Sequence, residues 1–366
     1  MLRLSKRFPR QYTPKHMATK QDKRARVGIL LMLALSALII IAGVSLGSTD
    51  ISFMDTVKSI ISGAFHIENS LGVSPGVQAI VFKLRLPRVL LAFLTGMAMA
   101  MSGAVTQSVL HNPLASPYTL GVSSGASLGA AIVTVLGITL PIARELSLAA
   151  IGTVFGIAAV IVCASFTAKV DKNMGSATIV LMGMVLSLFL SAVFTLIAGL
   201  SKENMTMLMR WQMGSFGSKG FKSVGVLAAV ILACCTAIML YTRELDIISL
   251  GDEQAFSIGV NVKRVKWILL ILTAVVSGTA VSFAGVIGFI DLIAPHLARR
   301  LFSPKHKYLC PLSALIGGCF MVVADLVSRI AIENTELPVG AVTAFIGAPF
   351  FAYVYFAGRR GGADAK

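Results

Sequence analysis

The sequence predicts an all-α polytopic membrane protein, a helical bundle with about ten transmembrane helices. Of its 366 residues, 56 % are hydrophobic and only 13 % are charged, and the mean hydropathy is +0.84. A soluble globular domain of this length is far less apolar. The apolar residues form long unbroken runs without the alternation of β-barrel strands. Helices are the other structure that pairs every backbone group inside lipid, so the spans are expected to be helical.

Ten apolar runs are candidates for membrane spans, because a helix needs about 20 apolar residues to cross a bilayer. Their approximate limits are 27–47, 89–110, 118–139, 147–168, 176–199, 223–242, 267–284, 287–301, 309–329 and 338–357. The eighth run is short and shares a glycine-rich turn with the seventh. Whether the eighth run crosses the bilayer completely is therefore left open.

Basic residues crowd the N-terminal segment, before the first apolar run. They are Arg3, Lys6, Arg7, Arg10, Lys15, Lys20, Lys23, Arg24 and Arg26. The positive-inside rule places this tail, 1–26, in the cytoplasm, and an even number of crossings returns the other tail, 359–366, to the same side. The first run is too long for a signal-peptide core and is followed by further spans, so we expect it to be retained. A transmembrane domain is thus predicted at 27–358.

The formal net charge of +16 does not indicate a nucleic-acid partner, because no polar stretch is long enough to form a basic domain. The five cysteines lie in or beside apolar runs, with neither metal-ligand nor disulfide spacing, which indicates packing residues. The sequence contains no Walker A motif and no catalytic triad. We therefore expect no enzyme activity, no metal and no cofactor on this chain, and an energy source on another chain.

Glycines and prolines mark the segment after the second run. Gly121, Gly125 and Gly129 recur every fourth residue, which places them on one helical face where another helix can approach closely. Pro113 and Pro117 break the helix just before them. Irregular backbone at a membrane edge is tolerated where it is buried in protein or lines a cavity. The turn between these prolines is either such a lining or a purely structural helix break.

Several motifs, in one collinear order, give the chain a close resemblance to the FecCD-type permease family of ATP-driven importers. These motifs are RLPR (85–88), NPLASP (112–117), LGVSSGASLG (120–129), LGDEQAFSIGV (250–260), GVIGFIDLIAPHLAR (285–299) and ELPVGAVTAFIGAPFF (336–351). The family has the type II ABC importer fold and serves siderophores, haem and vitamin B12. The resemblance covers nearly the whole chain after the basic tail and implies a permease subunit of the bacterial cytoplasmic membrane.

The resemblance also implies site residues at the outer face and at the inner gate. Three arginines match positions that dock acidic residues of a substrate-binding protein: Arg85, Arg88 and Arg329. Four residues match or lie beside the two inner constrictions: Asn112, Leu114, Gly175 and Ser176. For the first two arginines the alternative is snorkelling at the membrane interface, and for the gate residues it is a structural turn.

Two further sets follow from the same resemblance. The inner loop at 243–266 is similar to the coupling segment that contacts the ATPase, through Leu250, Gly251, Asp252, Glu253, Ala255 and Gly259. The alternative for this loop is a solvated surface. The outer segment after the fifth run matches part of the outer gate, with Met205, Met207, Met209 and Met213. Thioethers are adaptable enough for a gate, but ordinary packing explains them equally well.

Two carboxylates lie inside predicted spans, where an unpaired charge is costly. Asp325 falls where the family often has an acid and is expected to form structural hydrogen bonds. Asp291 departs from the family pattern, so its role in a pathway or with a local partner stays open. His296 is expected to be structural, since one histidine makes no metal site.

We therefore predict a permease that carries iron-siderophore-type metal chelates. The implied partners are a second permease subunit, identical or paralogous, a cytoplasmic ABC ATPase dimer that binds ATP and Mg²⁺, and an extracytoplasmic binding protein. Haem and cobalamin are the alternative cargoes. The rival classes are an ion-coupled secondary transporter, which needs a site near the membrane midplane, and a membrane-embedded enzyme, which needs convergent His, Asp or Glu ligands.

Overall fold

The computed structural model describes residues 20–47, 49, 51–65, 72–138, 146–171, 174–217, 219–333 and 335–363, with side chains in the last helix to residue 353. Every regular element in these ranges is helical. In order they are α1 Lys20–Ser45, α2 Phe53–Phe65, α3 Pro75–Gln78, η1 Ala79–Arg85, α4 Leu86–Val109, η2 Pro117–Leu120, α5 Val122–Leu136, α6 Ser147–Val170, α7 Ser176–Leu200, α8 Lys202–Gln212, α9 Phe221–Leu240, α10 Thr242–Ile248, α11 Asp252–Ser257, α12 Val262–Ala284, α13 Ile290–Leu301, α14 His306–Ile330 and α15 Val339–Ala363. The all-α prediction is confirmed.

All ten predicted runs fall on helices, and within the described residues seven helices are long and apolar enough to cross a membrane. These are α1, the continuous α3–η1–α4 stretch, α6, α7, α9, α12 and α14. The apolar parts of α5 and α15 are shorter. The eighth run gives α13, a helix of 12 residues, whose length of about 18 Å is well short of a hydrocarbon core of about 30 Å.

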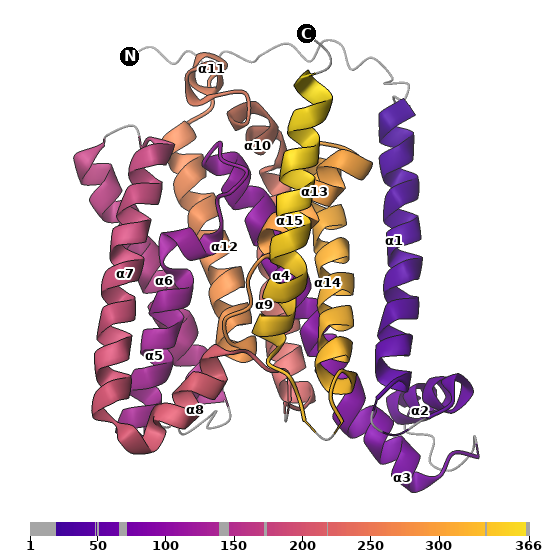
Figure 1. The fold of residues 1–366 in the computed structure, drawn as a ribbon. Helices are drawn as coiled ribbons and strands as arrows, with labels where there is room; N and C mark the ends of the chain where they lie inside the picture. The colour runs from indigo at the N-terminus through magenta and orange to yellow at the C-terminus, as the bar shows by residue number, and fades with distance from the viewer. Residues whose placement is uncertain are drawn as a thin grey trace, which may run out of the picture.

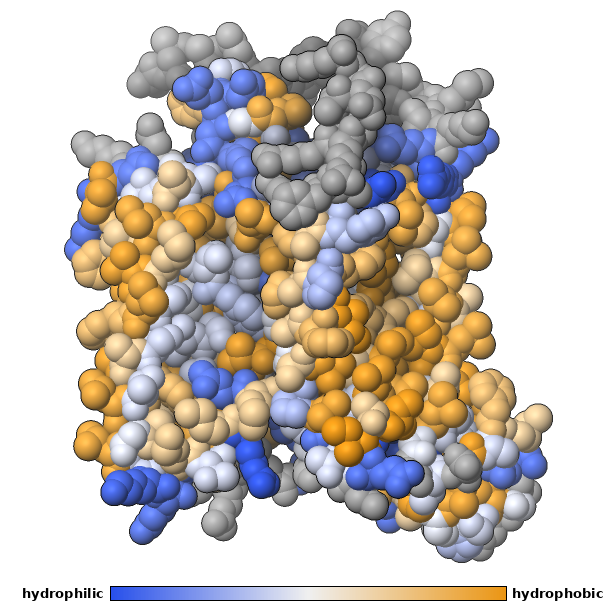
Figure 2. All heavy atoms as spheres, viewed as in Figure 1, coloured by the Kyte–Doolittle hydropathy of each residue, from blue (hydrophilic) through white to orange (hydrophobic). Residues whose placement is uncertain are grey.

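The helices lie roughly side by side, with α10 and α11 at one end of the bundle and α2, α3 and α8 at the other (Figure 1). We call these the α11 end and the α2 end. Helix α1 begins and helix α15 ends at the α11 end (Figure 1). Hydrophobic side chains form a broad band between the two ends, and hydrophilic side chains gather at both (Figure 2). A bilayer would cover this band.

The tails of the chain lie largely outside the described residues. Of the predicted N-terminal tail, 1–26, the structure describes the part from residue 20, and this part already belongs to α1. Of the C-terminal tail, 359–366, it describes residues 359–363 as the last turns of α15. Both predicted boundaries therefore fall inside helices.

The core of the bundle is built on α4, α12 and α14. In the most apolar window of the α3–η1–α4 stretch 78 % of the residues are buried, against 17 % in α7. Gly96 of α4 and Gly317 of α14 face each other so closely that a Cβ on either would overlap the carbonyl oxygen of the other. Small residues at such a contact let two backbones pack directly, which is how helices associate where no hydrophobic effect drives them together.

The glycines at the start of α5 serve two different purposes. A Cβ on Gly125 would lie 2.6 Å from the carbonyl oxygen of Phe155, and one on Gly129 would lie 3.1 Å from that of Ile151, so both face the backbone of α6. Gly121 lies before the helix with φ 91°, the left-handed conformation that ends η2. Gly121 is therefore a turn residue, and the four-residue spacing alone does not separate it from the packing pair.

Helices α2 and η1 were not predicted from the sequence. Helix α2 is a 13-residue helix at the α2 end with Thr56, Ser59 and Ser62 buried. Element η1 is a π-helix of seven residues that runs directly into α4. Such wide helical turns are rare and often occur at functional sites. Here η1 ends on Arg85, one of the three predicted docking arginines.

We expect Gly96→Val to destabilise the bundle, because the added side chain would push α4 away from Gly317. Overpacking of this kind costs roughly 1–3 kcal/mol, and backbone overlap places this site at the upper end. Gly225→Val is the matched control, since nothing lies within 4 Å of a Cβ on Gly225. Thermal unfolding in detergent should show a clearly lower Tm for Gly96→Val alone. Equal Tm values for the two variants would contradict the close α4–α14 contact.

Candidate functional site

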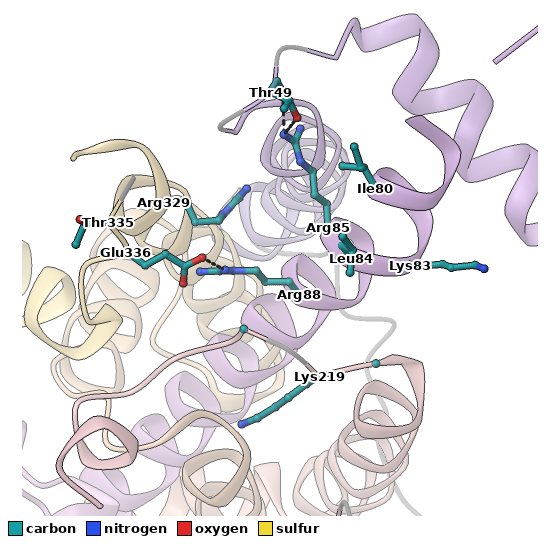
Figure 3. A pocket seen from close by; sticks show the side chains of 12 residues that line it. Thr49, Ile80, Lys83, Leu84, Arg85, Arg88, Lys219, Arg329, Thr335 and Glu336 are labelled. Carbon is teal, nitrogen blue, oxygen red and sulfur yellow. Dashed lines mark hydrogen bonds and ion pairs between the residues drawn. The ribbon is translucent and has the colours of Figure 1, made fainter. Parts of the chain in front are cut away.

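A cleft of about 810 Å³ opens at the α2 end of the bundle. It is lined by Thr49, Ile80, Lys83, Leu84, Arg85, Arg88, Gly217, Lys219, Gly220, Arg329, Thr335 and Glu336. The cleft brings together the three predicted docking arginines, from η1, α4 and α14 (Figure 3). Five of the lining residues are cationic and one, Glu336, is acidic, so the cleft favours negatively charged groups.

Arg85 and Arg329 cap the C-terminal end of α1. Arg85 Nη1 donates to the carbonyl oxygens of Val44 and Ser45 at 3.1 and 2.7 Å. Arg329 donates to Leu46 and Gly43 at 3.1 and 2.8 Å. The last carbonyls of a helix have no partner within it and carry the negative end of its dipole, so two guanidinium groups stabilise this end. Arg85 also donates to Thr49 (Figure 3) and is only 8 % exposed.

Asp325 bridges Arg88 and Arg329. Its Oδ1 lies 2.9 Å from Arg88 Nε and its Oδ2 lies 3.0 Å from Arg329 Nε. The Asp325 side chain is 0 % exposed, so the two charge-assisted bonds are formed away from water, where they are strong. The structural hydrogen-bonding role expected of Asp325 agrees with this geometry. The triad fixes α4 and α14 to each other, and Arg329 extends it to α1.

Arg88 also pairs with an acid at the surface of the cleft. Its Nη1 donates to Glu336 at 2.7 Å (Figure 3), and Glu336 is 55 % exposed. Its Nη2 is buried without a hydrogen-bond partner among the described residues. Lys83 is exposed on η1, and burial lowers the pKa of Lys219 to about 8. Lys219 therefore keeps its charge at neutral pH and loses it as the pH rises past 8.

Three members of this cleft were not predicted from the sequence: Lys83, Lys219 and Glu336. Lys83 lies two residues before Arg85, and Glu336 begins the motif ELPVGAVTAFIGAPFF, to which the family resemblance gave no role. Proximity to family motifs was the signal that could have found these two. Lys219 lies far from any motif in the sequence, in the turn before α9, and had no such signal.

At the α11 end, two irregular loops carry the predicted inner-gate residues. In the loop after α4, the Asn112 side chain accepts the backbone N–H of Leu114 at 2.9 Å, and Leu114 is 46 % exposed. In the loop before α7, the N–H of Gly175 donates to Asp171 Oδ2 at 2.8 Å, and Ser176 begins the helix. His111 joins the loops, with Nδ1 3.4 Å from the Ser176 hydroxyl. The structure thus places all four residues in one region.

The predicted coupling segment forms α10, a turn and α11, which lie at the α11 end (Figure 1). Gly251 and Gly259 have φ of 125° and 93°, conformations that side chains rarely adopt, and they enclose α11 on both sides. Ala255 faces inward at 0 % exposure, whereas Phe256 is 76 % exposed. Leu250 and Ile258 are also exposed. Apolar side chains presented this way on a short helix are typical of a docking surface.

A groove of about 790 Å³ runs beside α11. It is lined by Asp252, Glu253, Phe256, Ser257, Gly259, Val260, Asn261, Val262 and Lys263. Asp252 also turns inward, with Oδ2 2.5 Å from Nζ of Lys266. Acidic residues at the first turn of α11 interact favourably with the positive end of the helix, so they help this short element to form.

The methionines of the predicted outer gate lie on and just after α8, near the α2 end. Met205, Met207, Met209 and Met213 are 42–58 % exposed. Helix α8 is held by Leu208, which packs with Ala131, Phe194 and Ala198. Backbone bonds then join the next residues to α15: Gly340 donates to Met213 and Val339 to Gly214. The methionine cluster is thus an exposed surface on a firmly anchored segment.

Asp291 has a local partner. The Ser116 hydroxyl donates to Asp291 Oδ2 in a very short bond, and Gln107 donates to the Asp291 carbonyl oxygen at 3.1 Å. Ser116 belongs to the first inner-gate loop, so this buried acid holds that loop against α13. Among the described residues no three His, Cys, Asp or Glu side chains are grouped as metal ligands, so His296 belongs to no such group. The five cysteines are free.

The fold is that of a permease subunit of a type II ABC importer. A transporter assigned to the metal-chelate type of ABC transporter, solved in an inward-facing conformation, superposes with a TM-score of 0.78 at 26 % identity over 90 % of this chain and 98 % of that one. The FecCD transport family model matches residues 33–357. The chain belongs to the FecCD transport family, and the resemblance seen in its motifs is confirmed.

Two curated relatives agree with this membership. An uncharacterised ABC transporter permease of Bacillus subtilis, YvrB, is 37 % identical over 89 % of this chain and 92 % of its own length. The cobalamin import permease BtuC of Halobacterium salinarum is 37 % identical over 80 % of this chain and 77 % of its own. The chain is therefore a multi-pass, non-catalytic permease whose partner ATPase binds ATP. An ATPase and a substrate-binding protein are its partner classes.

We expect Asp325→Asn to destabilise the folded protein strongly, because it leaves the buried Arg329 without a counter-charge and Arg88 with only the half-exposed Glu336. Breaking a buried ion pair on one side costs about 3–5 kcal/mol. Glu336→Gln is the matched control. It removes an acid from the same cluster, but a half-exposed pair contributes less than about 1 kcal/mol. Thermal unfolding in detergent checks both variants. A Tm for Asp325→Asn as high as that of Glu336→Gln would show that Asp325 does not stabilise the contacts among Arg88, Arg329 and α1.

Proposed function

We propose that the chain is the membrane-spanning half of an importer for iron-siderophore-type chelates, paired with a second permease subunit and driven by a cytoplasmic ATPase dimer. The observation that carries the importer role is the α10–α11 segment, an exposed helical hairpin with Phe256 outward, at the opposite end from a cationic cleft. A binding protein would deliver cargo at the cleft end. ATP binding and hydrolysis by the ATPase at the α11 end would then open the outer gate and the inner gate alternately.

The cleft at the α2 end is proposed as the docking site for the binding protein. Because Arg85 and Arg329 are used to cap α1, docking would depend most on Arg88 and on the rim lysines. Glu336 occupies Arg88 in the free permease, so an incoming carboxylate would compete with this resident acid for the same guanidinium. Rim charges of this kind set the rate and the salt dependence of docking more than its strength.

Glu336→Gln should strengthen docking, because it removes the competing carboxylate, by up to about fivefold in Kd. Lys83→Glu should weaken docking by a similar factor, mostly at low salt, because exposed charges are screened. Surface plasmon resonance with the cognate binding protein on permease in nanodiscs measures both. Lys202→Glu, an exposed charge on α8 that does not line the cleft, is the control. Equal affinities of the parent and the three variants at low salt would rule out the cleft as the docking site.

The α11 end is proposed as the cytoplasmic face. Both described chain ends lie there (Figure 1), and the basic N-terminal tail would follow the positive-inside rule in a bacterial cytoplasmic membrane. The groove beside α11, with Leu250, Gly251, Asp252, Glu253, Ala255 and Gly259 in or next to it, would contact the ATPase. The inner gate would lie next to this contact and would consist of Asn112, Leu114, Gly175 and Ser176.

The outer gate and the dimer are proposed from exposed apolar surface. Met205, Met207, Met209 and Met213 present flexible thioethers near the delivery end, which suits a surface that closes on a second copy and yields to cargo. A homodimer or a pair of similar permeases would place the pathway between the two subunits. The pathway would bind cargo weakly, because a conduit that held the chelate tightly would not release it.

The cargo proposal rests on the structural neighbour of the metal-chelate type and on the excess of cationic groups at the delivery end. The cobalamin permease relative supports cobalamin as the alternative, and family membership supports haem. Uptake of a radiolabelled ferric hydroxamate into proteoliposomes that hold the whole complex and internal ATP should be reduced by excess ferric siderophores. If excess cobalamin or haem reduced this uptake and excess ferric siderophores did not, the siderophore proposal would be wrong and the competing compound would be the cargo.

A secondary transporter needs a different arrangement of charge. Its ion site would draw on a carboxylate near the midplane, yet Asp291 is bonded to Ser116 and Asp325 to two arginines. Neither acid is left to bind and release an ion. This geometry, together with family membership, favours the ATP-driven importer.

A further inference from the structure

Lys266 is a fully buried cation at the inner end of α12. Its side chain is 0 % exposed, and an ammonium group pays a large penalty for leaving water unless its donors are satisfied. Its Nζ lies 2.5 Å from Asp252 Oδ2 at the start of α11. It also donates to the carbonyl oxygen of Met174 at 3.3 Å. One buried charge therefore touches both the coupling segment and the loop that precedes the Gly175–Ser176 constriction.

Met174 is held in an unusual conformation at this contact. Its φ is 51°, in the left-handed region that bulky residues avoid. Its side chain is 0 % exposed, and its N–H donates to the carbonyl oxygen of Asp171 at 3.0 Å. Such backbone persists where the surroundings fix it, and strained positions of this kind cluster in switch regions. The ammonium group of Lys266 is part of what fixes it.

The other inner loop is tied to the coupling segment separately. His111, with φ 48°, places Nε2 2.6 Å from the carbonyl oxygen of Ile248 at the end of α10. That nitrogen must carry the proton, since a carbonyl oxygen can only accept. The same nitrogen lies 3.9 Å from Asp252 Oδ1, which is buried without a hydrogen-bond partner among the described residues. The first loop is thus tied to α10 through His111 and the second to α11 through Lys266, and the two loops touch only through the longer His111 Nδ1–Ser176 contact of 3.4 Å.

We propose that Lys266 is a positioning residue that transmits movement of α11 to the second inner-gate loop, at 174–176. The inference rests on the proposed coupling role of the α10–α11 segment. When the ATPase displaces α11, Asp252 moves with it, and Lys266 carries the displacement to the Met174 carbonyl group. Without the ammonium group, α11 would still dock and the ATPase would still turn over. The second loop, left with only the long His111–Ser176 contact, would follow much less, while the first loop would still follow through His111.

The test uses the complete complex of permease, cognate ATPase and binding protein in nanodiscs. A single reporter cysteine is placed at Ala177, exposed beside the second loop, or at Leu114 in the first loop. Cys234 and Cys235, which are partly exposed, are replaced by alanine, and the three buried cysteines stay. The rate of maleimide labelling is measured without nucleotide and after trapping with ATP and vanadate. ATP hydrolysis is measured on the same samples.

With Lys266 present, trapping should change the labelling rate at both reporters, by about fivefold or more. Lys266→Met should reduce the change at residue 177 to less than about twofold, keep it at residue 114, and leave hydrolysis within about twofold. Asp252→Asn should also suppress the change at residue 177, and combining it with Lys266→Met should add nothing further at that reporter, because both remove one link. Lys305→Met, which removes an exposed ion pair with Asp22 at the same end, is the control and should behave like the parent.

Two results would overturn the proposal. One is a full nucleotide response at residue 177 in Lys266→Met. The other is a loss of hydrolysis and of both responses in proportion to the amount of folded protein, which would make Lys266 merely structural. Phe256→Glu separates this inference from the coupling role itself. If Phe256→Glu leaves ATPase assembly intact, the coupling assignment is wrong. If it abolishes assembly while Lys266→Met changes nothing, only the role of Lys266 is wrong.

Discussion

The absence of water inside a bilayer governs this structure, because every buried charge must find its partner within the protein. Asp325 holds Arg88 and Arg329, the two arginines Arg85 and Arg329 cap α1, and Lys266 joins α11 to Met174. Apart from the Asp325–Arg329 pair within α14, these contacts connect elements that are distant in the sequence. The same requirement that makes a buried charge costly therefore makes it a strong link between helices at both ends of the bundle.

At the α2 end, this linkage explains why cationic residues are so numerous. Capping of α1 and pairing with Asp325 use most of the donors of Arg85 and Arg329, so their positive charge supports the fold as well as the surface potential of the cleft. Arg88 belongs to both systems. Its Nε is fixed to a buried acid, and its Nη1 faces an exposed one. The Glu336 loop continues into α15, whose first residues are bonded to Met213 and Gly214, so the cleft and the methionine segment share one backbone connection.

Periodicity and composition were sufficient for the helical class and for the ten apolar runs, since both are local properties of the chain. The family motifs led to Gly251 and Gly259, whose φ values show why glycine stands there. The motifs could not separate Gly121, a turn residue, from Gly125 and Gly129, because spacing does not reveal where a helix begins. The contact of Lys266 with Met174 and the capping function of Arg85 were missed since these partners lie 92 and 41 positions away. Long-range pairing of this kind leaves no pattern in a single sequence.

The central claim is that a separate ATPase moves this bundle, and transport under a controlled energy source tests it most directly. Proteoliposomes would hold the permease with its ATPase and receive loaded binding protein outside. Uptake of a labelled ferric chelate should require internal ATP, stop with a hydrolysis-deficient ATPase, and be unaffected when proton and sodium gradients are dissipated. Uptake that proceeds on an ion gradient without ATP would contradict the account.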